Sequence, residues 1–118
     1  MSRVAVVTGG ASGIGAAICR HLAAGGRRLG VLDVNAGAAD DLAGALRAEG
    51  WHAIAAPVDV SDRGAVDEAL ANVRAALGPV EILVTSAAIA GFVPFEELTI
   101  EDWTQTMTVN LTGTFHCI

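Results

Sequence analysis

Residues 4–15 have the sequence VAVVTGGASGIG, in which a short aliphatic run breaks into a glycine-rich turn. The aliphatic residues Val4 to Val7 predict a buried strand. The spacing of Ile14, Ile18 and Leu22 matches one face of a helix, which predicts a helix directly after the glycines. The chain therefore opens with a strand, a tight turn and a helix.

The glycines of this turn have mechanical reasons to be there. One allows a sharp turn, one lets the backbone approach a pyrophosphate, and one lets the helix pack against the strand. A second apolar run, Leu29 to Leu32, ends at Asp33, where a strand–helix–strand dinucleotide site places the carboxylate that binds the adenosine ribose hydroxyls. The pattern favours dinucleotide binding over the alternative, in which the glycines only form a tight turn.

Composition limits the classes of protein that fit. With 118 residues and 53% apolar content, the chain has the length of one domain and enough apolar material for a core. The net charge is −6 without a run of like charges, so nucleic acid and anionic membranes are poor partners. No apolar stretch approaches the length of a membrane span, and no secretory signal precedes the first strand. We expect a cytoplasmic protein.

The two cysteines do not form a recognisable redox or metal motif. Cys19 and Cys117 fall on separate predicted helices, and neither belongs to a C-x-x-C pair. We expect both to be reduced thiols that serve in packing, and we expect no metal site.

Short apolar runs alternate with helical patterns along the rest of the chain, which predicts an α/β fold with a parallel sheet buried on both faces. The expected strands after the first are 29–32, 52–58 and 82–84. The expected helices after the first are 36–49, a third from Ser61 or Asp62 to Leu77, and a last helix from about Thr99. The apolar faces expected to pack are Ala39, Leu42, Ala43 and Leu46 in the second helix, Val66, Leu70, Val73 and Leu77 in the third, and Met107, Leu111 and Phe115 in the last.

Right-handed crossovers then give a Rossmann-type doubly wound sheet with the strand order 3-2-1-4. A ligand is expected at the carboxyl ends of strands one and four, where the winding reverses. This topology gathers Gly9 to Gly15, Asp33, Asp59-Val60 and Thr85 to Ala88 along one crevice, although they are scattered in the sequence.

These motifs resemble the N-terminal, cofactor-binding half of the short-chain dehydrogenase/reductases. The resemblance rests on Thr8-Gly9-x-x-x-Gly13-Ile14-Gly15, Asp33, Asp59-Val60 and Val109-Asn110-Leu111-Thr112-Gly113, in this order and spacing. P-loop NTPases are a poor match because they need a lysine after the glycine loop, and this chain has none.

The resemblance implies roles for individual residues. The positions that match cofactor-binding residues of the family are Gly9, Ser12, Gly13, Ile14, Gly15, Asp33, Asp59, Val60, Thr85, Ala87 and Ala88. Asn110 matches the catalytic-site asparagine that orders a water and a backbone kink in the proton relay. The alternative for Asn110 is a helix asparagine satisfied by a neighbouring carbonyl.

Asp33 predicts NAD rather than NADP as the cofactor. A 2′-phosphate beside this carboxylate would meet like-charge repulsion, and Ser12 and Val34 stand where NADP-binding relatives often carry a basic residue. Arg27 and Arg28 precede the second strand, so we expect them to be solvated surface charges.

Two departures from the family pattern stand out. Thr85-Ser86-Ala87-Ala88 replaces the common Asn-Asn-Ala-Gly, so we expect weaker bracing of the sheet at Thr85 and a methyl group beside the nicotinamide ribose at Ala88. The chain also has no Tyr and no Lys, so the family's Tyr–Lys acid/base pair cannot be present. His21, His52 and His116 match no site position and are expected to pack or to lie on the surface.

The sequence ends at Ile118, within the apolar pattern of the last helix. We therefore expect residues 1–118 to be a truncated Rossmann domain whose missing half carries Ser, Tyr and Lys, and we expect the chain alone to be inactive. The full-length protein would be an NAD-dependent oxidoreductase that moves a hydride between the nicotinamide and a secondary alcohol or ketone. We expect it to be a homodimer or homotetramer, with residues 89–95 forming one wall of the substrate site. The alternative is a non-catalytic dinucleotide-binding module or a complementing fragment.

Overall fold

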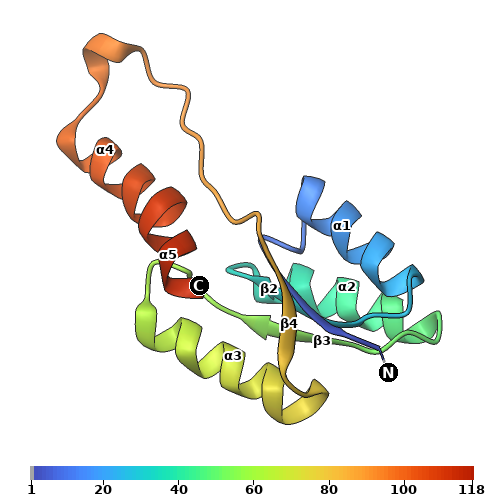
Figure 1. The fold of residues 1–118 in the computed structure, drawn as a ribbon. Coiled ribbons are helices and arrows are strands. Elements are labelled where there is room, and N and C mark those ends of the chain that lie inside the picture. The colour runs from blue at the N-terminus through green and yellow to red at the C-terminus, as the bar shows by residue number, and fades with distance from the viewer. Residues whose placement is uncertain (1) are drawn as a thin grey trace.

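A computed structural model describes residues 2–118 and shows a four-stranded parallel sheet with helices on both faces (Figure 1). The strand order is β3-β2-β1-β4, as the sequence predicts. The elements in chain order are β1 (Val4–Thr8), α1 (Gly13–Ala24), β2 (Arg28–Asp33), α2 (Ala36–Ala48), β3 (Ala53–Pro57), α3 (Arg63–Leu77), β4 (Val80–Thr85), a 3-10 turn (Phe95–Glu97), α4 (Ile100–Met107), a π-helical segment (Thr108–Thr112) and α5 (Gly113–Cys117).

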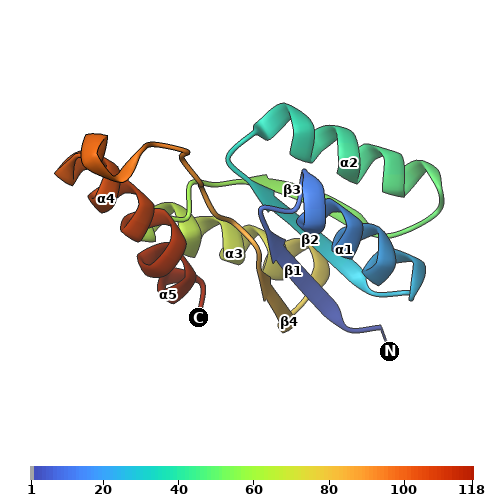
Figure 2. The same ribbon diagram turned by 90° about the horizontal axis from the view of Figure 1, so that it is seen from above.

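The helices divide into two layers, with α1 and α2 on one face of the sheet and α3 and α5 on the other (Figure 2). Successive residues of β1 serve these two layers in turn, because side chains alternate along a strand. Ala5 and Val7 pack into the core beneath α1 and α2, whereas Val4 and Val6 pack into the core beneath α3. Burial on both faces explains why β1 has no polar residue before Thr8.

The predicted face of α1 is wrong. Ile14 is 77% exposed, and the buried positions are instead Gly15, Ala16, Cys19 and Ala23. The reason is the close approach of α1 to the sheet, which only small side chains permit. The larger Ile18 and Leu22 lie at the margin of the contact and are partly buried.

The last helix also differs from its prediction. It begins after Thr99, where a reciprocal capping box with Asp102 satisfies the first turn, but a π-helical segment then interrupts it at Thr108–Thr112. Leu111 and Phe115, expected to be buried, are 61% and 66% exposed. The helix instead packs through Gly113 and Cys117, because Gly113 lies against Val60, where a Cβ atom would come within 2.6 Å of that side chain.

The second and third helices largely follow their predictions. In α2 the buried residues are Ala39, Leu42, Ala43 and Leu46, as expected. Asp62, rather than Ser61, caps α3 by accepting a hydrogen bond from the backbone N–H of Ala65 (3.1 Å). The buried face of α3 contains Val66, Ala69, Val73 and Leu77, while Leu70 lies at its margin.

Two strand assignments need correction. β4 begins at Val80 and is an edge strand whose burial alternates, so the expectation of two buried faces fails there. Arg28 is the first residue of β2 and is half-buried, with its guanidinium donating to the carbonyl of Ser2 (3.4 Å), so it is not a solvated surface charge. It sits there because β1 and β2 pair from Val4 and Arg28 onward.

Both cysteines are free thiols inside the protein, which agrees with their expected role in packing. Burial raises the pKa of Cys19 to about 11, so this thiol stays protonated and unreactive. Across residues 2–118, no cluster of His, Cys, Asp and Glu side chains has an arrangement that could hold a metal ion. None of the described helices has the length and apolar character needed to cross a membrane.

Two glycine-to-alanine changes should have opposite effects on stability, because only one of the two glycines lies at the contact between α1 and the turn before it. A Cβ atom at Gly15 would collide with the carbonyl oxygen of Gly9, so Gly15→Ala should lower the free energy of unfolding by about 1–3 kcal/mol. Gly44 lies within α2 with room for a methyl group, so Gly44→Ala should raise it by about 0.5–1 kcal/mol. Urea unfolding of both variants measures the two values, and equal effects would contradict this account.

Candidate functional site

The glycine turn between β1 and α1 is shaped by backbone conformations and contacts that exclude side chains. Gly9 and Gly13 have positive φ angles of 62° and 55°, which L-residues with a side chain rarely adopt. A Cβ atom at Gly9 would lie 2.8 Å from the Cα of Ala87, and one at Gly15 would strike the Gly9 carbonyl oxygen. The turn therefore lies directly against both α1 and the segment that follows β4.

Thr8 fixes the segment after β4. Its side chain is buried, and its hydroxyl oxygen accepts hydrogen bonds from the backbone N–H groups of Ser86 (3.1 Å) and Ala87 (3.2 Å). Only weak bracing was expected from Thr85, and its side chain is exposed at the end of β4. Thr8, its partner on the neighbouring strand, makes the hydrogen bonds to this segment instead.

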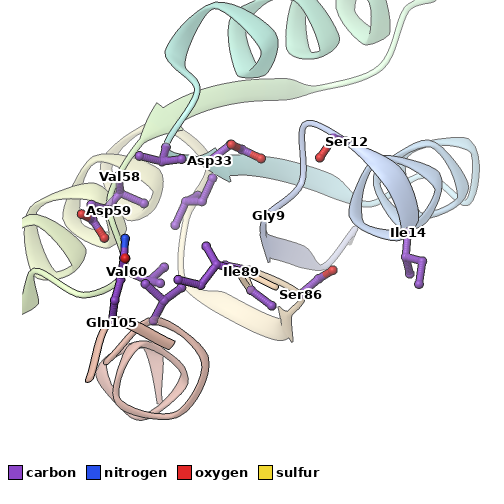
Figure 3. A pocket seen from close by; sticks show the side chains of 15 residues that line it. Gly9, Ser12, Ile14, Asp33, Val58, Asp59, Val60, Ser86, Ile89 and Gln105 are labelled. Atoms are coloured by element: carbon purple, nitrogen blue, oxygen red, sulfur yellow. The ribbon is translucent and has the colours of Figure 1, made fainter. Parts of the chain in front are cut away.

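A cavity of about 600 Å³ lies at the carboxyl ends of the strands, where the sequence predicts a ligand (Figure 3). The predicted site residues that line it are Gly9, Ser12, Ile14, Asp33, Asp59, Val60, Ala87 and Ala88. The other four do not line it. Gly13 and Gly15 shape the turn and its packing. Thr85 is exposed at the end of β4, and Asn110 is hydrogen-bonded to the backbone of Ile89. The fold therefore brings eight of the twelve predicted site residues to one cavity.

Five lining residues lie outside the residues and segments expected at the site: Leu32, Val34, Val58, Gln105 and Val109. Ser86 and Ile89, which also line the cavity, belong to the expected segments 85–88 and 89–95. Leu32, Val34 and Val58 are sequence neighbours of the predicted carboxylates, so their adjacency to strand ends was a usable signal. Gln105 and Val109 come from α4 and the π-helical segment, and only the packing of that helix beside the sheet brings them to the cavity.

Asp33 stands at the end of β2 with both carboxylate oxygens in hydrogen bonds. Oδ2 accepts from the backbone N–H of Ala11 in the glycine turn (3.0 Å), and Oδ1 accepts from the backbone N–H of Asn35 (3.0 Å). Each oxygen retains capacity for a further donor from a ligand. Val34 next to it is 73% exposed and presents an apolar side chain to the cavity.

Asp59 is the second carboxylate of the cavity and follows β3. Its Oδ1 accepts hydrogen bonds from the hydroxyl (2.7 Å) and the backbone N–H (3.0 Å) of Ser61. These bonds, that of the side chain first, lower the pKa of Asp59 below its ordinary value. Asp59 is therefore ionised at neutral pH and can accept a hydrogen bond from a ligand amino group.

Asn110 pairs with the backbone of a single residue. Its Oδ1 accepts from the N–H of Ile89 (2.8 Å), and its Nδ2 donates to the carbonyl of Ile89 (2.9 Å). The backbone carbonyl of Asn110, in the π-helical segment, accepts from the hydroxyl of Thr114 in α5 (3.0 Å). The side chain thus attaches the last helix to the start of segment 89–95, of which only Ile89 reaches the cavity wall.

The three histidines lie in two kinds of environment. His21 and His52 are exposed, as expected. His116 is half-buried, and its Nδ1 lies 2.8 Å from the carbonyl oxygen of Val60, so it connects the last helix to the loop after β3. The charged side chains that line the cavity within residues 2–118 are the two carboxylates, and no Arg or His is among them.

The match to known families defines the class of protein. The family model described as short chain dehydrogenase matches residues 3–118. This chain therefore belongs to the short-chain dehydrogenases, a family of oxidoreductases that use nicotinamide cofactors and act on small molecules.

Individual relatives give the same class. The chain is 43% identical to the D-threitol dehydrogenase of Mycolicibacterium smegmatis over 96% of its own length and 44% of the relative's. It is 39% identical to the 2,3-dihydro-2,3-dihydroxybenzoate dehydrogenase of Bacillus subtilis over 97% of its length and 44% of the relative's. The chain thus spans less than half the length of these relatives and corresponds to their N-terminal half.

Solved structures agree with the fold. A dehydrogenase/reductase from Sinorhizobium meliloti superposes with a TM-score of 0.94 at 37% identity, over all of this chain and 48% of that one. A blue fluorescent protein from a metagenomic library, solved in complex with NADPH, superposes with a TM-score of 0.90 at 39% identity, over 98% of this chain and 48% of that one.

The hydrogen bonds at Asp59 predict a pH effect. Ser61→Ala removes the hydroxyl that donates to Oδ1, so the pKa of Asp59 should rise towards its ordinary value. Because the native pKa lies below the unfolded one, the stabilisation from Asp59 is complete at neutral pH and is lost as the pH falls through the native pKa. In the variant, the stabilisation from Asp59 should be smaller, and it should be lost at a higher pH. NMR titration of the Asp59 carboxyl in both proteins measures the shift, and Ser61→Thr, which keeps a hydroxyl, is the matched control.

Proposed function

We propose that this chain is the cofactor-binding half of an NAD-dependent oxidoreductase. One observation carries the proposal: the glycine turn, Asp33 and Asp59, which are far apart in the sequence, line one cavity at the carboxyl ends of the strands. Such an arrangement suits an elongated ligand with a central pyrophosphate and a purine nucleoside at one end.

The residues present fit this group. Gly9 and Gly13 leave the backbone of the turn without a side chain at two positions, and the turn opens α1 at the helix end that favours anions. Asp33 would accept from the ribose hydroxyls and Asp59 from the adenine amino group, with Val60 beside the ring. Ile14 would bind the adenosine and pyrophosphate portions with the turn, and Ala87 and Ala88 would line the path toward the nicotinamide half. Gly15 and Thr85 would act on the shape of the site from outside it.

Charge favours NAD over NADP in this proposal. Asp33 would stand beside the adenosine ribose, where a 2′-phosphate would be repelled. Val34, the exposed neighbour, offers that phosphate no positive partner. The NADPH-bound relative of 39% identity shows that the fold also accepts the phosphorylated cofactor, so the side chains at 33 and 34 carry the distinction proposed here.

When bound, the cofactor would accept a hydride from a secondary alcohol or donate one to a ketone. The chain has no Tyr and no Lys to move the accompanying proton. Asn110 would act as a positioning residue, because its side chain is hydrogen-bonded to the backbone of Ile89 at the cavity wall. We therefore propose that residues 1–118 form one Rossmann domain, incomplete by comparison with its relatives and inactive alone.

Two further parts of the proposal concern where the enzyme is located and how it assembles. We propose a cytoplasmic enzyme that assembles as a homodimer or homotetramer through the helix that contains Asn110. The exposed apolar side chains Trp103, Leu111 and Phe115 on this helix are suited to such a contact.

Cofactor titration tests the central claim. NADH should bind at least roughly tenfold more tightly than NADPH, and Asp33→Asn should narrow the difference because it removes the repulsive charge. Asp40→Asn, which removes an exposed carboxylate from α2, is the control and should leave the ratio unchanged. Isothermal titration calorimetry gives both dissociation constants. Tighter binding of NADPH to the unaltered protein would refute the assignment.

The competing proposal is a non-catalytic dinucleotide-binding module or a complementing fragment, which the absence of Tyr and Lys favours. The coding sequence beyond residue 118 separates the two. An in-frame Ser followed by Tyr-x-x-x-Lys is expected if the protein is the enzyme, whereas a stop codon directly after Ile118 would favour the module.

A further inference from the structure

We propose that the Asp33 carboxylate is a clamp that holds the glycine turn in its ligand-ready shape before any dinucleotide binds. Asp33 is then a positioning residue for residues 9–13, in addition to the ribose contact proposed above. The clamp itself needs no ligand, and only its benefit to dinucleotide binding rests on the proposed function.

The turn needs such support because its own sequence makes it flexible. Gly9 and Gly13 adopt positive φ angles, and glycine loses more conformational freedom on ordering than any other residue. Ser12 is the N-cap of α1, but its side chain makes no capping hydrogen bond. The shape of the turn therefore depends on contacts with its surroundings.

Two consecutive amides connect the turn to the end of β2. The N–H of Gly10 donates to the carbonyl of Leu32 (3.0 Å), and the N–H of Ala11 donates to Oδ2 of Asp33 (3.0 Å). The first bond is between backbone atoms, whereas the second depends on the side chain. An ionised acceptor makes the second bond the stronger kind.

The other carboxylate oxygen fixes the orientation of the Asp33 side chain. Oδ1 of Asp33 accepts from the N–H of Asn35, the N-cap of α2 (3.0 Å). One carboxylate thus joins the turn before α1 to the start of α2. Because both oxygens are engaged, the side chain cannot rotate without losing a bond.

The clamp has a consequence for changes of cofactor preference. Removing the Asp33 carboxylate would relieve the repulsion of a 2′-phosphate, but it would also release the Ala11 amide and loosen the turn proposed to hold the pyrophosphate. Val34→Arg, in contrast, would add a cation beside the ribose position and leave the clamp intact.

Amide hydrogen exchange, followed by NMR on the ligand-free protein, tests the clamp. In Asp33→Ala the Ala11 amide should exchange roughly tenfold faster or more, because its charged acceptor is gone. The Gly10 amide should keep its exchange rate, because the carbonyl of Leu32 is still present. Asp33→Asn, which has the same size but one acceptor oxygen, should release only one of the Ala11 and Asn35 amides. Asp40→Asn should change neither.

Two results would overturn the clamp. One is an Ala11 amide that exchanges equally fast in the unaltered protein and in Asp33→Ala. The other is an equal acceleration of Ala11 and Gly10, which would show a general loosening instead of a local release. If Asp33→Ala does not fold, the isosteric Asp33→Asn decides. A preference for NADPH would refute the proposed cofactor and leave the exchange result standing, since no ligand is present in the measurement.

Discussion

No Cβ atom fits between the glycine turn, the first turn of α1 and the segment after β4, and the rest of the site depends on this constraint. Gly15 packs against the carbonyl of Gly9, and Gly9 packs against the backbone of Ala87. Because three backbone segments meet without side chains between them, the turn lies low over the carboxyl end of β1. The cavity is the space left above that contact.

Short polar side chains hold the remaining walls of the cavity by bonding to backbone atoms of other segments. Thr8 binds the amides after β4, Asp33 binds the amide of Ala11, and Asn110 binds both backbone groups of Ile89. His116 does the same for the carbonyl of Val60. Loops that are far apart in the sequence are thereby fixed relative to one another, which a site for a long ligand requires.

The chemistry of the chain is uneven along this cavity. Its carboxylates and glycine turn suit the nucleoside and pyrophosphate parts of a dinucleotide, but no tyrosine or lysine is present to transfer a proton. This unevenness agrees with a chain that spans less than half the length of its relatives. In the function proposed here, residues 1–118 hold the cofactor, and the residues that transfer the proton lie outside them.

The sequence by itself determined the strand order, the glycine turn and most of the cavity lining, because strand runs, helix periods and carboxylates at strand ends are local patterns. Tertiary structure decided the rest. It turned the small face of α1, and not Ile14, toward the sheet, and it exposed Phe115 by packing the last helix through Gly113. It also brought Gln105 to the cavity. Periodicity shows which residues share a face, but the distance between packed backbones decides which face is buried.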